Sequence, residues 1–270
     1  MRRICNVFFA CLMSVTMLTA QDSSDKPEVD EKYKMFSKTM WRRMDFKIKQ
    51  NRPFNSINGE MSKLLMEALA AGDIKAYKSD SCKVVATGTE LDEMLTIIEV
   101  VGVDHDNDPF TPDVMDSVQT TLPYNIFEVM YIKEDVIFDR NRSRMYWYIR
   151  SLSITVPSNP DYLASFNISG ELDKVLNFKY DEVVKAFKMD KYKDRAIWYN
   201  GQNISSHRSM PEAMELRLFS APIIKVANNQ DRDIRQLYGA EIAADPMRAM
   251  IIQQQLEYDL AEYEAEMWSY

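Results

Sequence analysis

The chain has 270 residues, of which 33 are basic and 41 acidic, so its formal net charge is −8 and its pI is about 5.0. An acidic protein is a poor match for nucleic acid, whose phosphates require basic surfaces, so we expect no nucleic-acid partner. Hydrophobic residues make up 46% of the chain and charged residues 27%, a balance that is typical of a globular protein and excludes an intrinsically disordered one.

Residues 1–20 are predicted to form a secretory signal peptide. Arg2 and Arg3 provide a positive start, residues 7–18 form an apolar run too short to span a bilayer, and Ala20 offers a small residue for cleavage. Loss of the two arginines would leave 31 basic and 41 acidic residues, a net charge of −10. The expected product is a soluble exported protein.

The cysteines bear on the same question. Cleavage would remove Cys5 and Cys11 and leave Cys82 alone, so no internal disulfide is expected in the mature protein. Acylation at Cys11 is an alternative, but the residues before it make a poor lipobox. We interpret Cys82 as a small buried residue.

The first element is predicted to be a basic amphipathic helix over 31–50, after a flexible polar stretch at 21–30. Apolar residues recur at spacings of three and four, typical of one helix face: Tyr33, Phe36, Met40, Met44 and Ile48. In 31–52 eight basic residues oppose two acidic ones, a local charge of +6. Such a run is ordinarily a solvated face; the functional interpretation is a docking surface for an acidic partner, with Arg42, Arg43 and Lys47 as candidate contacts.

Three further elements are expected before the centre of the chain. A helix over 60–71 ends at Gly72, short strands follow at 74–77 and 83–86, and a helix over 90–101 is capped by Thr89 and closed by Gly102. The acidic run at 104–108 resembles the start of a calcium loop. Pro109 and Met115 stand where that loop needs glycine and glutamate, which favours an ordinary acidic loop.

The strongest β signal lies at 124–157. Two runs rich in aromatic and β-branched residues flank a polar turn at 139–143, which predicts an antiparallel hairpin. Large residues occupy both alternating rows of the second arm, so this strand should be buried on much of both faces. We therefore expect an α+β fold, with a small and mostly antiparallel central sheet flanked by helices, and one domain over 31–270.

The remaining elements are predicted to end in a long helix. A loop is expected at 158–161, a strand at 175–180, a short helix at 181–187, packed aromatics at 196–199, a helix from a capping box at Ser209 to about 219, and a strand at 223–226. The last helix starts at Asp245-Pro246. Its apolar stripe consists of Ile252, Leu256, Leu260, Tyr263 and Met267.

This last helix has an acidic end. No basic residue occurs from 257 to 266, whereas five acidic residues do: Glu257, Asp259, Glu262, Glu264 and Glu266. Negative charge at a helix C-terminus opposes the macrodipole, by about 0.3–1 kcal/mol per group. Either water screens it, or a basic surface meets it, belonging to this chain's own first element or to a neighbour's. Contacts between the acidic helix of one copy and the basic element of a neighbouring copy would run head to tail and give a ring or a filament. Candidate contacts here are Trp147, Glu262, Glu264, Glu266 and Trp268.

A search for catalytic motifs mostly fails. The seven glycines are too dispersed for a phosphate-binding loop, and neither a GxSxG elbow nor zinc spacing occurs. His105 and His207 lie far apart in polar segments. We expect a protein that is not an enzyme and has no metal or cofactor, although sequence leaves open a pair of catalytic carboxylates.

Four segments together resemble the GldN/PorN family of gliding-motility and type IX secretion proteins. WRRMDFKIKQNRP (41–53) is similar to its W-x-R-x-I-D-x-R-E-K-x-N-x-P, and MSKLLMEALAAGDIKAY (61–77) to its L-x-x-A-x-x-x-G-x-I-x-A-Y. YIKEDVIFD (131–139), followed by Arg142-Ser143, resembles its I-K-E-D-W-I-F-D-x-x-R-S, with Val136 in place of the tryptophan. The tail, with LEYDL (256–260) and EMWSY (266–270), is similar to its acidic, tryptophan-containing end.

The resemblance implies a function that the residues alone do not. It implies a non-enzymatic periplasmic subunit of a large ring at the inner face of the outer membrane. The ring would be built with a lipoprotein of the GldK/PorK type and would meet the periplasmic part of a motor of the GldM/PorM type. The alternative is an exported protein that binds glycans or peptides through the aromatics around Trp147 and Trp198.

Overall fold

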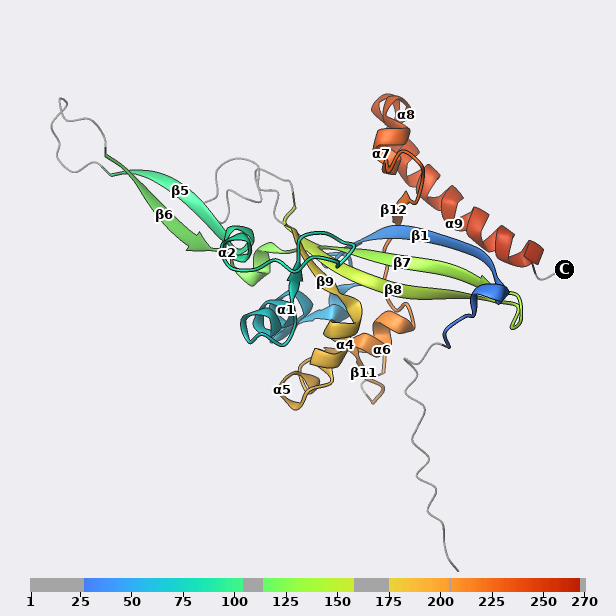
Figure 1. Cartoon of the computed structure of the whole chain (residues 1–270), viewed down its shortest axis with the longest axis horizontal. Helices are drawn as coiled ribbons and strands as arrows, with labels where there is room; N and C mark the ends of the chain where they lie inside the picture. Colours follow the sequence, from blue (N-terminus) through green and yellow to red (C-terminus); the bar gives the residue numbers. More distant parts are fainter. Residues whose placement is uncertain (1–26, 104–113, 158–174, 204, 268–270) are drawn as a thin grey trace, which may run out of the picture.

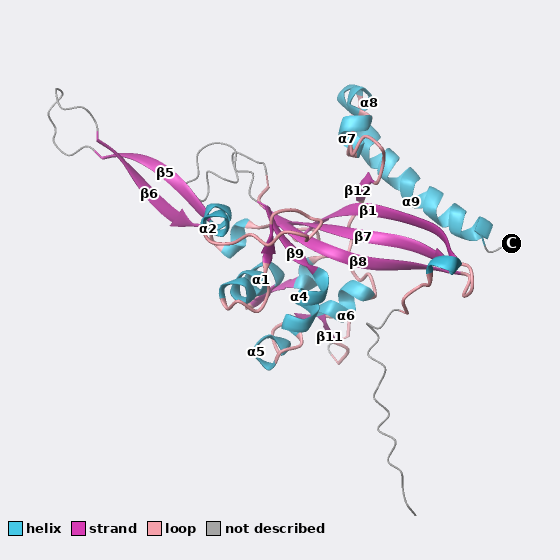
Figure 2. Cartoon of the chain, in the orientation of Figure 1, coloured by secondary structure: helices cyan, strands magenta, loops and turns pink. Residues whose placement is uncertain are grey.

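A six-stranded antiparallel sheet forms the centre of the protein, seen in a computed structural model that describes residues 27–103, 114–157, 175–203 and 205–267 (Figures 1 and 2). The strand order is β12-β1-β7-β8-β9-β4. The strands are β1 (Lys34–Asp45), β4 (Ala76–Tyr77), β7 (Val129–Asp139), β8 (Arg144–Thr155), β9 (Val175–Lys179) and β12 (Ile223–Val226). The predicted α+β class, with its antiparallel sheet, is therefore confirmed.

The predicted central hairpin is β7 and β8. They pair from Val129↔Thr155 to Asp139↔Arg144, with one irregularity at Lys133/Glu134. Asp139, which is buried, closes the turn: its carboxylate accepts hydrogen bonds from the backbone N–H of Asn141 at 2.8 Å and from Arg142 Nη1 at 2.9 Å. Local turn chemistry thus sets the register of the two longest neighbours in the sheet.

The predicted basic helix over 31–50 is wrong, because this segment contains β1. A spacing of four residues fits one face of a helix and also one face of a strand, so Phe36, Met40 and Met44 satisfy both patterns. The strand pairs with β7 from Lys34↔Asp139 to Asp45↔Val129 and with β12 on its other edge. The backbone N–H and C=O groups of this segment thus bind to two neighbouring strands. The periodicity of the segment alone does not show that such strands exist elsewhere in the chain.

The predicted helix over 90–101 is only half right. The helix α2 (Thr89–Leu95) gives way to β5 (Thr96–Val103), which pairs with β6 (Val114–Thr121) in a hairpin that projects away from the central sheet (Figure 1). The β-branched residues of β5 explain the change. Gly102 lies within β5 and does not end a helix. The calcium-like run at 104–108 lies outside the described residues.

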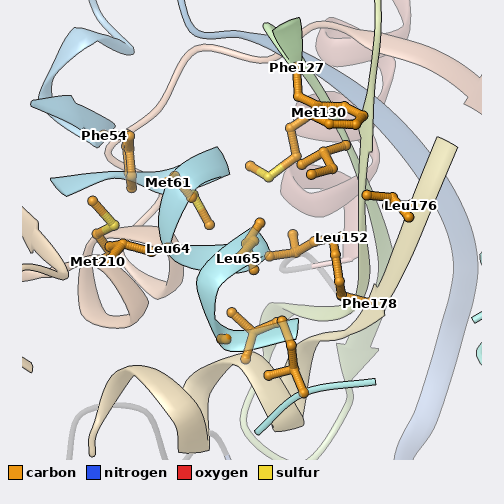
Figure 3. Close-up of a cluster of buried hydrophobic side chains, with 14 of the residues drawn as sticks. Phe54, Met61, Leu64, Leu65, Phe127, Met130, Leu152, Leu176, Phe178 and Met210 are labelled. Carbon is orange, nitrogen blue, oxygen red and sulfur yellow. The ribbon is translucent and has the colours of Figure 1, made fainter. Parts of the chain in front are cut away.

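The main core lies between the sheet and a group of helices, α1 (Met61–Ala70), α4 (Tyr180–Phe187), α5 (Asp190–Lys193) and α6 (Met210–Glu215) (Figure 1). Figure 3 shows Leu64 and Leu65 of α1 among side chains from strands β7, β8 and β9 and from α6. Ser209 caps α6 as predicted, its Oγ accepting from the backbone N–H of Glu212. The helix ends at 215, before the predicted 219, and Arg217 then adopts a left-handed φ of 56°.

A second group of helices completes the described chain: α7 (Ile234–Leu237), α8 (Gly239–Ala244) and the long α9 (Met247–Met267), which lies beside β1 in Figure 1. The predicted C-terminal helix is therefore confirmed. Of the predicted strand at 83–86, only Val85 pairs, through a single bridge to Tyr77. The short elements are η1 (Glu31–Tyr33), η2 (Arg52–Phe54), β2 (Asn55–Ser56), β3 (Gly59–Glu60), η3 (Tyr124–Ile126), β10 (Ile197–Trp198) and β11 (Arg208–Ser209).

Candidate interaction site

The helix α9 packs on the sheet over a small apolar cluster, here called the second cluster. Its buried members are Met40, Val136, Phe138, Met145, Ile223 and Met267, and Leu256 and Leu260 of α9 pack against them. Alternate residues of a strand point to one side, so Met40, Arg42 and Met44 share one side of β1. Met44 belongs to the main core. Arg42 therefore stands at the boundary between the main core and the second cluster.

Four charged side chains meet at this boundary and form what we call the arginine–glutamate cluster: Arg42, Glu134, Arg217 and Glu257. Glu134 is fully buried and accepts hydrogen bonds from Arg42 Nε and, at 2.6 Å, from Arg217 Nη1. Arg42 also donates through Nη1 to the carbonyl oxygen of Ala221 at 2.9 Å and to the carboxylate of Glu257 on α9. One buried carboxylate thus joins strands β1 and β7 to the segment after α6, and Arg42 joins them to α9.

The electrostatics of the cluster are balanced only when α9 is present. Burial alone would lower the pKa of Arg42, but the negative charges of Glu134 and Glu257 outweigh it and raise the pKa of the guanidinium. The two arginines and two glutamates are together neutral. Without Glu257 the remaining three groups would carry one surplus positive charge next to an apolar cluster, and solvent that reaches the half-exposed position of Glu257 would screen it only in part.

Arg217 is held between aromatic rings. Its guanidinium lies 5.3 Å from the ring centre of Trp147 and 5.4 Å from that of Phe219, within cation–π range. The left-handed backbone at Arg217 ends α6 and allows the side chain to turn toward Glu134. The two rings and Glu134 therefore hold the guanidinium of Arg217 in place, whereas the carboxylate that α9 contributes binds Arg42.

Hollows surround the contact between α9 and the rest of the chain. One of about 550 Å³ is lined by Met250 and Glu257 of α9 and by the segment around Phe219. Others of about 290 Å³ and 220 Å³ lie between α9 and β1 and next to Trp147. Of the 21 residues of α9 only Ile252 and Met267 are buried. The helix is thus attached by a narrow seam.

The structure brings three of the predicted contact residues together. Arg42, Trp147 and Glu264 all line the 220 Å³ hollow beside Arg217. The basic first element and the acidic last helix do meet within one chain, at Arg42 and Glu257. The basic element is a strand, and its arginine is buried, so the surface expected there is an internal contact at this position.

The other candidates lie elsewhere. Arg43 forms an ion pair with Asp45 at 3.8 Å, and Lys47 pairs with Glu128 at 2.6 Å. Glu262 and Glu266 are exposed on α9. Trp268 lies outside the described residues. A role for these residues in partner binding stays a prediction.

Sequence reasoning missed Glu134 and Arg217. A signal for Glu134 was present: it interrupts an alternating row of large apolar residues, Met130, Ile132, Val136 and Phe138, in which every neighbour is buried. An acidic residue in such a row needs a buried cation, and Arg42 pairs with it across the sheet. Arg217 had no comparable signal, because it follows a helix in an irregular segment.

Other places on the molecule offer less. Trp147 packs against the second cluster and Trp198 against the main core. The ring of Trp41 lies under the ammonium groups of Lys133 and Lys225, at 5.0 and 4.6 Å, and donates its indole N–H to Asp80. Within the described ranges, no group of three His, Cys, Asp or Glu side chains is arranged to hold a metal ion.

The fold and this site define an α+β protein whose last helix is docked through a buried charge cluster. A sequence model of the family described as "Gliding motility associated protein GldN" matches residues 29–269, and the chain belongs to this family. A comparison with curated proteins gave no match. The GldN family is associated with gliding motility and type IX secretion and is not a family of known enzymes. In the part of the chain that the structure describes, every helix is too short or too polar to cross a bilayer.

Proposed function

We propose that this chain is a non-enzymatic structural subunit of the periplasmic ring of the type IX secretion and gliding machinery. The observation that carries the proposal is the family match over 29–269, nearly the whole chain. The segments quoted for the resemblance lie on elements that the fold uses: β1, α1, the β7–β8 hairpin and α9. Residues 31–270 would act as one domain after removal of a signal peptide at 1–20.

The proposed partners are an outer-membrane lipoprotein of the GldK/PorK type, the periplasmic part of a motor of the GldM/PorM type, and further copies of this chain. The protein would lie at the inner face of the outer membrane, held there by the lipoprotein. Two structural features support an assembly role: the β5–β6 hairpin projects away from the sheet, and α9 exposes most of its surface (Figure 1). The hairpin presents strand edges, and α9 presents side chains, that a partner could cover.

The test is to purify the tagged chain from detergent-solubilised envelopes, identify bound proteins by mass spectrometry and view the same fraction by electron microscopy. A large ring with a co-purifying lipoprotein is the expected result. A monomer without partners would contradict the proposal and favour the glycan- or peptide-binding alternative.

Charge reversal tests the surface contacts. Arg43→Glu with Lys47→Glu is expected to weaken co-purification of the lipoprotein, because it reverses two partly exposed cations, one in β1 and one just after it. Arg42 is left unchanged, since its reversal would disrupt the buried cluster. The matched control is Lys185→Glu with Lys193→Glu, on exposed positions of α4 and α5. Equal assembly of both variants would remove the basic-surface role but not the family assignment.

A further inference from the structure

The attachment of α9 has the character of an exchangeable contact. The helix touches the sheet through Leu256, Leu260 and Met267 and through Glu257. The tilted rings of Tyr263 and Phe36 also meet, with their centroids 4.7 Å apart. The hollows described above lie on both sides of this seam. Only Ile252 and Met267 of α9 are buried, so release of the helix would disrupt these contacts and the few that it makes with β12, α7 and α8, such as the ion pair of Arg248 with Glu241.

The surface under α9 is selective for a helix that carries a carboxylate. Arg42 is almost completely buried, and Glu134 and Arg217 already neutralise each other. A helix docked here must therefore bring a negative charge to Arg42, next to an apolar stripe that fits Met40 and Ile223. The acidic end of α9 supplies such a charge at Glu257. Any copy of this chain supplies the same helix.

The connection to α9 is long enough to reach a neighbouring subunit. The twenty residues 227–246 separate β12 from α9, and a chain of this length spans up to about 65 Å when extended. The short helices α7 and α8 interrupt it, and Asp231 and the Asp245-Pro246 step mark breaks between regular elements. Rotation about these breaks would redirect α9 without disturbing the sheet.

We propose that α9 is exchanged between adjacent copies in the assembled protein, so that α9 of one copy lies on β1 and β12 of the next, with its Glu257 on that copy's Arg42. The contact in the exchanged form is chemically the same as the contact within one chain, so exchange loses none of its interactions. Adjacent copies held by a common partner raise the local concentration of neighbouring helices. This inference deepens the proposed function, on which it rests for the setting of the contact.

The geometry of exchange favours a closed arrangement, either a reciprocal pair of copies or the ring of the proposed function. Each copy gives one helix and receives one, through two different surfaces, so contacts run head to tail. In an open chain the last copy would keep an empty receptor with a surplus charge at Arg42. Either closed arrangement leaves no receptor empty.

The first experiment uses two chains with different tags, both carrying Cys82→Ser. One carries Phe36→Cys and the other Tyr263→Cys, two positions whose rings touch in the structure. The chains are produced together in cells that make the natural partners, and the envelopes are oxidised. Exchange predicts a covalent dimer that contains both tags. The matched control pairs Tyr263→Cys with Met189→Cys, an exposed position beside α4 and α5, and should give at least tenfold less dimer.

The second experiment places Phe36→Cys and Tyr263→Cys in one chain, again with Cys82→Ser. Oxidation of the isolated monomer locks α9 onto its own sheet, and the locked chain should fail to form rings with purified partners until a reductant is added. The single-cysteine chains, treated in the same way, control for oxidation damage.

Two outcomes would overturn the exchange: no tag-mixed dimer above the Met189→Cys control while the same cysteine pair does close within the isolated double-cysteine chain, or rings that form equally well from the locked chain. Neither outcome bears on whether the unmodified chain co-purifies with the lipoprotein. Failure of the exchange and failure of the proposed function are therefore distinguishable.

Discussion

The buried carboxylate of Glu134 offers the most direct test of the charge cluster. Glu134→Gln conserves the volume of the side chain, so it opens no cavity and isolates the effect of the charge. The carboxylate accepts from Arg42 Nε and from Arg217 Nη1 and Nη2, the latter two at 2.6 and 3.3 Å. The glutamine amide would turn its own N–H group toward these guanidinium donors and would carry no charge. Glu257 would then be the only carboxylate left in the cluster for the two guanidinium groups. We expect the free energy of unfolding to fall by about 3–5 kcal/mol, the usual cost of breaking a buried ion pair from one side.

The assay is urea unfolding of the mature chain, followed by circular dichroism and tryptophan fluorescence. The matched variant is Glu257→Gln, whose side chain is 45% exposed where that of Glu134 is 0% exposed. Solvent screens the exposed pair, so this variant should cost only about 0.5–1 kcal/mol. Equal losses for the two variants, or a loss below about 1 kcal/mol for Glu134→Gln, would refute the reasoning from burial.

Three further variants or treatments test other parts of the fold. Leu65→Ala in the main core should cost about 2–5 kcal/mol because its site is fully buried, whereas Leu216→Ala, at an exposed position, should cost under about 1 kcal/mol by the same urea assay. Gly59→Ala should destabilise by about 1–3 kcal/mol, because its Cβ would lie 2.6 Å from the carbonyl oxygen of Arg195, whereas Gly201→Ala has nothing within 4 Å and should be neutral. Burial raises the pKa of the Cys82 thiol to about 11 from its ordinary 9.0, so the thiolate is scarcer in the folded chain. Alkylation by iodoacetamide at pH 8 should be about 100-fold slower than in urea, and should keep accelerating up to about pH 11 only in the folded chain; equal rates in both states would contradict this.

The parts of the fold that sequence predicted are those with strong local signals. The β7–β8 hairpin, the helix α1 with its glycine stop, the cap at Ser209 and the start of α9 each depend on residues close together in the chain. Two predicted elements were wrong or partly wrong. Over 31–50 the apolar pattern fits both a helix and a strand, and over 90–101 a β-branched run was overlooked. In both cases the deciding partner was another strand.

The sequence predicted that the two ends of the chain carry opposite charges, but it did not predict which charged side chains pair. The polarity between the basic first element and the acidic last helix is visible in the sequence, and Arg42 meets Glu257 across 215 positions. The buried partner of Arg42 was not identified, because Glu134 lies 92 positions from Arg42 in the sequence, and Arg217 lies a further 83 positions from Glu134. Charge composition shows that opposite surfaces exist, but pairing in three dimensions decides which of them are internal.

The presence of a charged cluster between two apolar clusters needs its own explanation, since apolar residues of similar size often give equal or greater stability. An apolar seam would accept any amphipathic helix in several registers, whereas Arg42 accepts only a helix with a carboxylate in the right place. We therefore expect that a fourfold variant, with Arg42→Met, Glu134→Leu, Arg217→Met and Glu257→Leu combined, will have a free energy of unfolding equal to that of the unmodified chain or up to about 4 kcal/mol above it. Protection of the α9 amides from hydrogen exchange should nevertheless fall, because the register is no longer fixed. A fourfold variant as unstable as Glu134→Gln, or one with unchanged α9 protection, would show that the cluster serves stability and not selection of the helix.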